Sequence, residues 1–301
     1  MRCCPASAIV VYLSYEKHLV KLAHCERGKM ETPKRYEELR FTDDFMFCKI
    51  MTTRLDICKD VLELILGFEI KEVKLAEAQK SIEMTSDGKG IRLDVYVDDD
   101  ENTVYDIEMQ TTFQADIAKR SRYYQGMIDL NLIERGALYK ELKKSFIIFI
   151  CMERPFRNDK NDLPIYTFKN VCMENKDIVL SDEAAKVFLN VSSERDDIPE
   201  SIKEFFEYLK GNSLEGELNK RIEDAVSKAV AHTEWRSDYM TLQQQYNQKY
   251  AEGLAEGLEK GRIIEICNFV REGYIDIKRG AEKLGISEEK MAEYLASEEY
   301  Q

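Results

Sequence analysis

Two neighbouring runs of the chain, Ile91–Val97 and Thr103–Gln110, alternate between apolar and polar residues. The polar stretch between them, Asp98–Asn102, is rich in residues that favour turns. This pattern predicts a β-hairpin, because a strand with one buried face repeats with a period of two residues. If the apolar faces of the two strands coincide, Asp94 lies opposite Glu108, with their Cβ atoms about 5 Å apart.

Further helices and strands are predicted on both sides of this hairpin. Helical spacing begins near Glu37, with Thr42 as the expected N-cap, and returns in Leu55–Leu66, which ends at Gly67, and in Phe113–Leu132. The run Ser145–Met152 is apolar throughout, which is typical of a strand covered on both faces, and Ile165–Phe168 predicts another strand. The combination predicts an α/β fold with a mixed sheet.

The pattern changes after the polar stretch Ser192–Pro199, beyond which strand patterns largely disappear. The expected helical segments are Glu200–Lys210, the long charged region Leu214–Gly261, Ile263–Arg271, Asp276–Leu284, and a last helix with Ser287 as its N-cap. Glycines repeat every four residues in YAEGLAEGLEKG, which indicates a flexible or closely packed connector. We therefore expect a core domain over residues 30–192, a helical connector over 193–262 and a helix-turn-helix-like tail over 263–301.

Residues 1–29 look foreign to this organisation. The run PASAIVVYLSY holds about eight consecutive apolar residues, too few to span a bilayer, and no convincing signal-peptide pattern surrounds it. We expect this segment to be a disordered or spurious extension, with Met30 as the natural start. No membrane attachment is expected.

Charge and cysteine content narrow the choice of partners. The formal net charge of −13 over 301 residues argues against a chain-wide coat of nucleic acid, since non-specific DNA affinity depends on Lys and Arg. A local basic groove remains compatible with the sequence, because residues 119–144 contain Lys119, Arg120, Arg122, Arg135, Lys140, Lys143 and Lys144 against Asp129, Glu134 and Glu141. The 8 cysteines form no Cys-x-x-Cys pair, so we expect reduced thiols in a cytoplasmic protein and no zinc site.

The polar face of the predicted hairpin has the chemistry of a divalent-metal site. Asp94, Glu108 and Gln110 would supply carboxylate and amide oxygens, the ligands that Mg²⁺ prefers. An ion held there could polarise a phosphodiester and acidify a bound water. The spacing alone is also compatible with an exposed polar face that only maintains solubility.

Four motifs in order add specificity: RFTDDFMF at 40–47, DGKGIRLDV at 87–95, IEMQ at 107–110 and KRSRYYQ at 119–125. In this order and spacing they resemble the PD-(D/E)XK nuclease family transposases, also called Rpn-type recombination-promoting nucleases. The resemblance implies a restriction-endonuclease-like mixed-sheet core with a C-terminal all-α extension. It also implies a Mg²⁺-dependent DNA endonuclease, with Mn²⁺ as a possible substitute, associated with recombination or mobile elements.

The resemblance also implies roles for individual residues. Asp94 and Glu108 would bind the metal, and Gln110 would take the place of the catalytic Lys in the family's name. Asp43 or Asp44, in the first turn of the helix that follows Thr42, would approach the metal. The substrate contacts would come from Lys119, Arg122, Tyr124 and Gln125, on the helix that lines the groove.

The replacement of Lys by Gln keeps a second interpretation open. Gln110 can orient a water by hydrogen bonds but brings no positive charge. Together with the acidic net charge, this is compatible with a catalytically inactive nuclease fold that serves as an interaction or DNA-binding protein. The last helix, with Glu288, Glu289 and Glu293, carries few residues that read DNA bases, so the C-terminal helices are expected to dock a protein partner or a second copy at least as readily.

Overall fold

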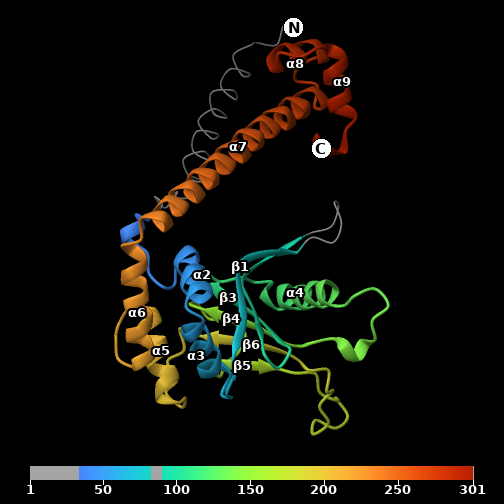
Figure 1. The fold of residues 1–301 in the computed structure, drawn as a ribbon. Coiled ribbons are helices and arrows are strands. Elements are labelled where there is room, and N and C mark those ends of the chain that lie inside the picture. Colours follow the sequence, from blue (N-terminus) through green and yellow to red (C-terminus); the bar gives the residue numbers. More distant parts are fainter. Residues whose placement is uncertain (1–33, 83–89, 301) are drawn as a thin grey trace, which may run out of the picture. The chain divides into compact units, whose positions relative to one another are not determined.

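A six-stranded mixed sheet forms the centre of the protein (Figure 1). The computed structural model describes residues 34–82 and 90–300. The strands, in the order β1-β2-β3-β4-β6-β5, are β1 (Val73–Ile82), β2 (Ile91–Asp99), β3 (Thr103–Gln110), β4 (Lys144–Cys151), β6 (Ala184–Asn190) and β5 (Ile165–Phe168). The pairs β3–β4 and β4–β6 are parallel, whereas β1–β2, β2–β3 and β5–β6 are antiparallel. The expected α/β fold with a mixed sheet is confirmed.

The hairpin of β2 and β3 forms as its alternating pattern predicts. Val95 pairs with Ile107 in the antiparallel ladder. The buried carboxylate of Asp99 closes the turn, since it accepts hydrogen bonds from the backbone N–H of Thr103 (2.8 Å) and the hydroxyl of Tyr105 (2.8 Å). The turn therefore satisfies its own polar groups although it lies against the core.

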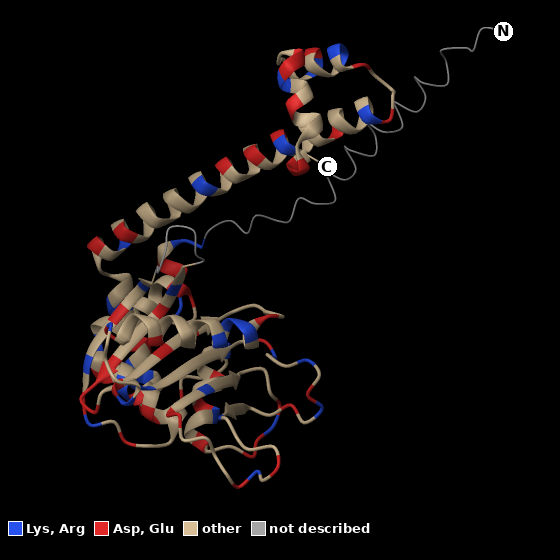
Figure 2. Ribbon diagram, turned by 90° about the vertical axis from the view of Figure 1, so that its right-hand side faces the viewer, with Lys and Arg blue, Asp and Glu red and all other residues tan. Residues whose placement is uncertain are grey.

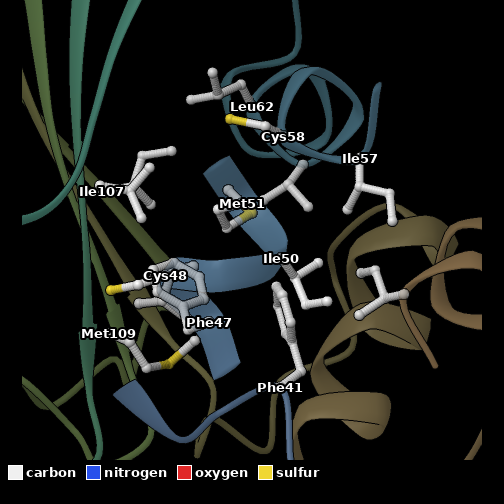
Figure 3. Packing of buried hydrophobic residues seen from close by; sticks show 14 of the residues in the cluster. Phe41, Phe47, Cys48, Ile50, Met51, Ile57, Cys58, Leu62, Ile107 and Met109 are labelled. Atoms are coloured by element: carbon white, nitrogen blue, oxygen red, sulfur yellow. The ribbon is translucent and has the colours of Figure 1, made fainter. Parts of the chain in front are cut away.

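Helices α2 (Asp44–Thr53) and α3 (Leu55–Leu66) pack in the core on one face of the sheet, together with α5 (Glu200–Lys210) and α6 (Glu217–Val230). Figure 3 shows side chains of α2 and α3, among them Met51 and Leu62, gathered near Ile107 of β3. Helix α3 has the predicted bounds because Gly67 ends it in the left-handed conformation, with φ of 73°.

Helix α4 (Ile117–Leu132) packs on a second hydrophobic cluster, which contains Tyr124, Ile128 and Phe149. The ring of Phe149 in β4 stacks on Phe188 in β6 at a centroid distance of 5.3 Å. The predicted start of this helix at Phe113 was wrong by four positions. Phe113 instead packs its ring against the guanidinium of Arg157, 3.6 Å from the ring centroid.

The C-terminal part is helical, as expected, but one break lies elsewhere. The predicted helical region Leu214–Gly261 divides into α6 and α7 (Thr233–Arg271), and α7 continues through Gly253, Gly257 and Gly261 into the stretch predicted as a separate helix, Ile263–Arg271. Its end forms a small separate core with α8 (Ile277–Leu284) and α9 (Glu288–Ala296). Ser287 caps α9, its side chain accepting the N–H of Lys290 at 3.2 Å, as predicted. Figure 2 shows acidic and basic residues interspersed along these helices.

Other predictions were wrong or lie outside the described residues. The stretch near Glu37 forms only the short 3₁₀ helix η1 (Tyr36–Glu38). Helix α2 has Asp43 rather than Thr42 at its N-cap, since the backbone of Asp43 is still extended (φ −81°, ψ 130°) and the helix begins at Asp44. Strands β1 and β6 were not predicted. The expectations for residues 1–29 and for DGK at 87–89 fall outside the described part of the chain. Within that part, no helix is long and apolar enough to cross a membrane.

Candidate active site

Strands β2 and β3 separate just beyond the pair of Val95 and Ile107. There the backbone N–H of Asp94 donates to Oε1 of Glu108 (2.9 Å), and the N–H of Met109 donates to Oδ2 of Asp94 (3.2 Å). Buried backbone N–H groups need acceptors, and beyond the end of the ladder the two carboxylates replace the backbone oxygens of the neighbouring strand in this role. The structure thus brings Asp94 and Glu108 together, as the hairpin pattern predicted.

The two carboxylates lie in an environment that disfavours their negative charge. Glu108 is fully buried, and its Oε2 lies 2.6 Å from Nη2 of Arg120. Burial and then the charge of Asp94 raise the pKa of Glu108 above its usual range, against the opposing effect of Arg120. Burial and then the charge of Asp44 raise the pKa of Asp94 to about 6. A cation bound here would be stabilised, because it reduces the repulsion among the negative charges of Asp44, Asp94 and Glu108.

A third carboxyl, Asp106, lies on the same strand face as Glu108 and is also fully buried. Neither of its oxygens accepts a hydrogen bond from an N–H or hydroxyl group among the described residues. Burial and the charge of Glu108 raise the pKa of Asp106 well above its usual range. The raised pKa favours the neutral form of Asp106, and a neutral carboxyl can donate a hydrogen bond to Glu108.

Arg120, from α4, ties the end of β3 to this helix. Its Nη2 donates to Glu108, its Nη1 donates to Oε1 of Gln110 (3.0 Å), and its Nε donates to the hydroxyl of Tyr124 (2.7 Å). Because Arg has only donors, these bonds also determine that the amide oxygen of Gln110 faces α4. From the sequence, Arg120 was expected only as one of the basic residues of 119–144, although its four-residue spacing from Tyr124 was a usable signal.

Asp44, in the first turn of α2, acts on the hairpin. Its charge contributes to the raised pKa of Asp94, and its Oδ2 accepts a hydrogen bond from the amide of Gln79 in β1 (3.3 Å). Cys48, also in α2, donates a hydrogen bond from its thiol to the backbone oxygen of Asp94 (3.3 Å). Asp43 instead accepts the backbone N–H of Arg40 at 2.8 Å.

The four residues expected to contact substrate are divided between two environments on α4. Lys119 and Arg122 are exposed. Tyr124 is buried beneath Arg120, and Gln125 donates to the hydroxyl of Ser145 at 2.7 Å. Gln125 is thus held against β4 rather than presented with the exposed pair.

The donor set fits a hard divalent cation. Asp94 and Glu108 supply carboxylate oxygens, and Asp44 adds negative charge nearby, so the chemistry matches Mg²⁺ or Mn²⁺ rather than a softer metal. Among the described residues, no group of three or more His, Cys, Asp or Glu side chains is assembled for metal binding. Two carboxylates suffice for Mg²⁺, which usually retains several waters.

Comparison with known proteins identifies the family of the chain. The profile of the PD-(D/E)XK nuclease family transposases matches residues 42–256, which include the hairpin, α4 and most of the helices that follow. No curated protein and no solved structure matches the chain. The matched segment covers more than half of the chain and contains the site described above. The chain therefore belongs to the PD-(D/E)XK nuclease family transposases.

Proposed function

We propose that this protein is a divalent-metal-dependent DNA endonuclease that hydrolyses phosphodiester bonds and is associated with recombination or mobile elements. The observation that supports it best is the pairing of Asp94 with Glu108 where β2 and β3 separate. Membership of a nuclease family supports the class of reaction. Nucleases of the PD-(D/E)XK type typically use divalent metals, which agrees with the excess negative charge at this point.

In this proposal Asp94 and Glu108 hold Mg²⁺, with Mn²⁺ as a substitute, and Asp44 is the third acid nearest to them. When bound, the ion would lower the pKa of a water and neutralise charge on the phosphate. Gln110, whose oxygen is held by Arg120, orients the attacking water through its amide N–H. Asp43, whose Oδ2 accepts the N–H of Arg40, is the alternative acid from the start of α2.

The reaction is the hydrolysis of one phosphodiester. The oxygen of water forms a bond to phosphorus, one ester P–O bond breaks, the proton of the water passes to solvent, and the departing oxygen takes a proton. On α4, the exposed Lys119 and Arg122 contact the DNA backbone as point charges. Tyr124 and Gln125 stabilise this helix: Tyr124 accepts a hydrogen bond from Arg120, and Gln125 donates one to Ser145.

The test is plasmid cleavage by the purified protein with Mg²⁺ and then Mn²⁺. Asp94→Asn and Glu108→Gln keep the side-chain shapes but remove the charges, so each should abolish cleavage. Asp177→Asn, which removes an exposed carboxylate outside the site, should leave cleavage unchanged. Cleavage that persists equally in the Asp94 and Glu108 variants would refute the assigned site.

One observation also favours the second candidate, a catalytically inactive nuclease fold that binds DNA or a protein. Arg120 donates hydrogen bonds to both Glu108 and Gln110, so these two side chains have a partner without a metal. If this candidate is correct, calorimetric titration with millimolar Mg²⁺ or Mn²⁺ will show no binding that depends on Asp94. The plasmid will then remain intact with wild-type protein and with every variant.

A further inference from the structure

The amide of Gln110 contacts the positively charged guanidinium of Arg120. Gln110 is a neutral amide at the position where the family's name has a Lys, and its Oε1 accepts a hydrogen bond of 3.0 Å from Nη1 of Arg120. Arg120 reaches this point from α4, ten positions further along the chain. The charge that β3 does not carry is therefore present at the same place on another element.

The guanidinium of Arg120 is held in one orientation. Its three side-chain hydrogen bonds join Glu108, Gln110 and Tyr124, at 2.6, 3.0 and 2.7 Å. The ring of Tyr124 lies 5.0 Å from the guanidinium carbon, within the range of a cation–π contact. A long side chain fixed in this way loses little further freedom when it binds a ligand.

This arrangement leaves donors for a further acceptor. A guanidinium has five N–H groups, and the three bonds above use one on Nε, one on Nη1 and one on Nη2. Each terminal nitrogen therefore retains one N–H. The side chain of Arg120 is 29% exposed, whereas that of its partner Glu108 is fully buried, so Arg120 is the more accessible member of the pair.

We propose that Arg120 supplies the positive charge that Gln110 lacks, and that its two remaining N–H groups bind a phosphate of the substrate strand. The inference rests on the proposed nuclease function for the identity of the substrate. The N–H groups of a guanidinium carry positive charge, and their hydrogen bonds to phosphate oxygens are stronger than bonds between neutral groups. Arg120 is thus a substrate-binding residue that also positions the amide of Gln110.

A purely structural ion pair is the competing explanation. Arg120 would then serve only to neutralise the buried carboxylate of Glu108, which is costly to leave unpaired. The two explanations differ in whether a positive charge moved from position 120 to position 110 can restore DNA binding. If the charge itself matters at this point, a Lys at position 110 should replace the guanidinium of Arg120.

The experiment is a charge swap between these two positions. Arg120→Gln, Gln110→Lys and the double variant are compared with wild type for binding of a short DNA duplex in EDTA, over a series of salt concentrations. Arg120→Gln should weaken binding roughly tenfold and reduce the salt slope by about one. The double variant should recover affinity and slope, because it restores one cation at the same place.

Two further variants serve as controls. Lys176→Gln removes an exposed positive charge from a loop outside the basic stretch, and should leave the binding affinity within about twofold of wild type. Arg120→Lys keeps the charge at its original position and should retain the salt slope. Thermal melts establish that each variant folds, and if the double variant does not fold, Arg120→Lys against Arg120→Gln decides the question.

The outcomes separate this inference from the proposed function. Unchanged DNA binding in Arg120→Gln, or a double variant as impaired as the two single changes combined, overturns the role of Arg120 even if wild type cleaves plasmid. Recovery in the double variant supports that role even if no plasmid is cleaved, and in that case only the proposed nuclease activity fails.

Discussion

Replacing Asp94 by Asn should stabilise the metal-free protein while it destroys the site. The substitution removes a negative charge but keeps the side-chain shape, and the Asn oxygen can still accept the backbone N–H of Met109, which lies 3.2 Å from Oδ2. The carboxylate of Asp94 is mostly buried, and the charge of Asp44 acts on it. A neutral amide is free of both penalties.

The magnitude follows from the pKa of Asp94, which rises from 3.8 to about 6. Because the folded state binds this proton more tightly than the unfolded state, the free energy of unfolding falls as the pH rises from about 3.8 to about 6 and stays lower above it. At about 1.4 kcal/mol per pKa unit, the ionised carboxylate costs up to about 3 kcal/mol at neutral pH. Asp94→Asn should recover much of this.

The assay is urea denaturation in EDTA at pH 7.5 and at pH 4.5. The variant should have the higher midpoint at pH 7.5, and its advantage should shrink at pH 4.5, where wild-type Asp94 is mostly protonated. Mg²⁺ should then raise the midpoint of wild type but not of the variant. A variant that is less stable than wild type at pH 7.5 in EDTA would refute the reasoning, since the hydrogen bonds of the carboxylate would then outweigh the cost of its charge.

Further predictions concern other parts of the core and are checked by urea denaturation. Asp106→Asn should change the free energy of unfolding by less than about 1 kcal/mol, because burial favours the neutral form of Asp106 and the amide is also neutral; a loss of several kcal/mol would show that Asp106 is ionised. Leu62→Ala should cost about 2–5 kcal/mol, since Leu62 is fully buried, and a loss below 1 kcal/mol would contradict its packing. Gly67→Ala and Gly211→Ala should each cost about 1–2 kcal/mol, because both glycines have positive φ; the two losses should be similar, because the new Cβ at 211 meets only the movable end of the exposed Arg40 side chain while that at 67 meets open space, and a much larger loss at 211 would show that Arg40 cannot move aside.

The sequence determined the elements whose signals are local. The hairpin formed because alternation on two adjacent runs and a polar turn act over about twenty residues. Helix α3 and helix α5 had their predicted bounds because Gly67 and Gly211 adopt positive φ, which glycine does at little cost. The pairing of Asp94 with Glu108 followed from the same short-range register.

Tertiary structure decided what depends on distant neighbours. β1, VKLAEAQKSI, lacks a clear alternation and is a strand because it pairs along β2, while β6 is a short run that pairs with β4. Gln125 shares a three-residue step with Lys119 and Arg122, yet the sheet draws its amide to Ser145. Arg120 reaches Glu108 and Gln110 only because α4 packs beside the end of β3. Patterns along one element show which face is apolar, but the partner of a polar side chain is set by the element that packing brings to it.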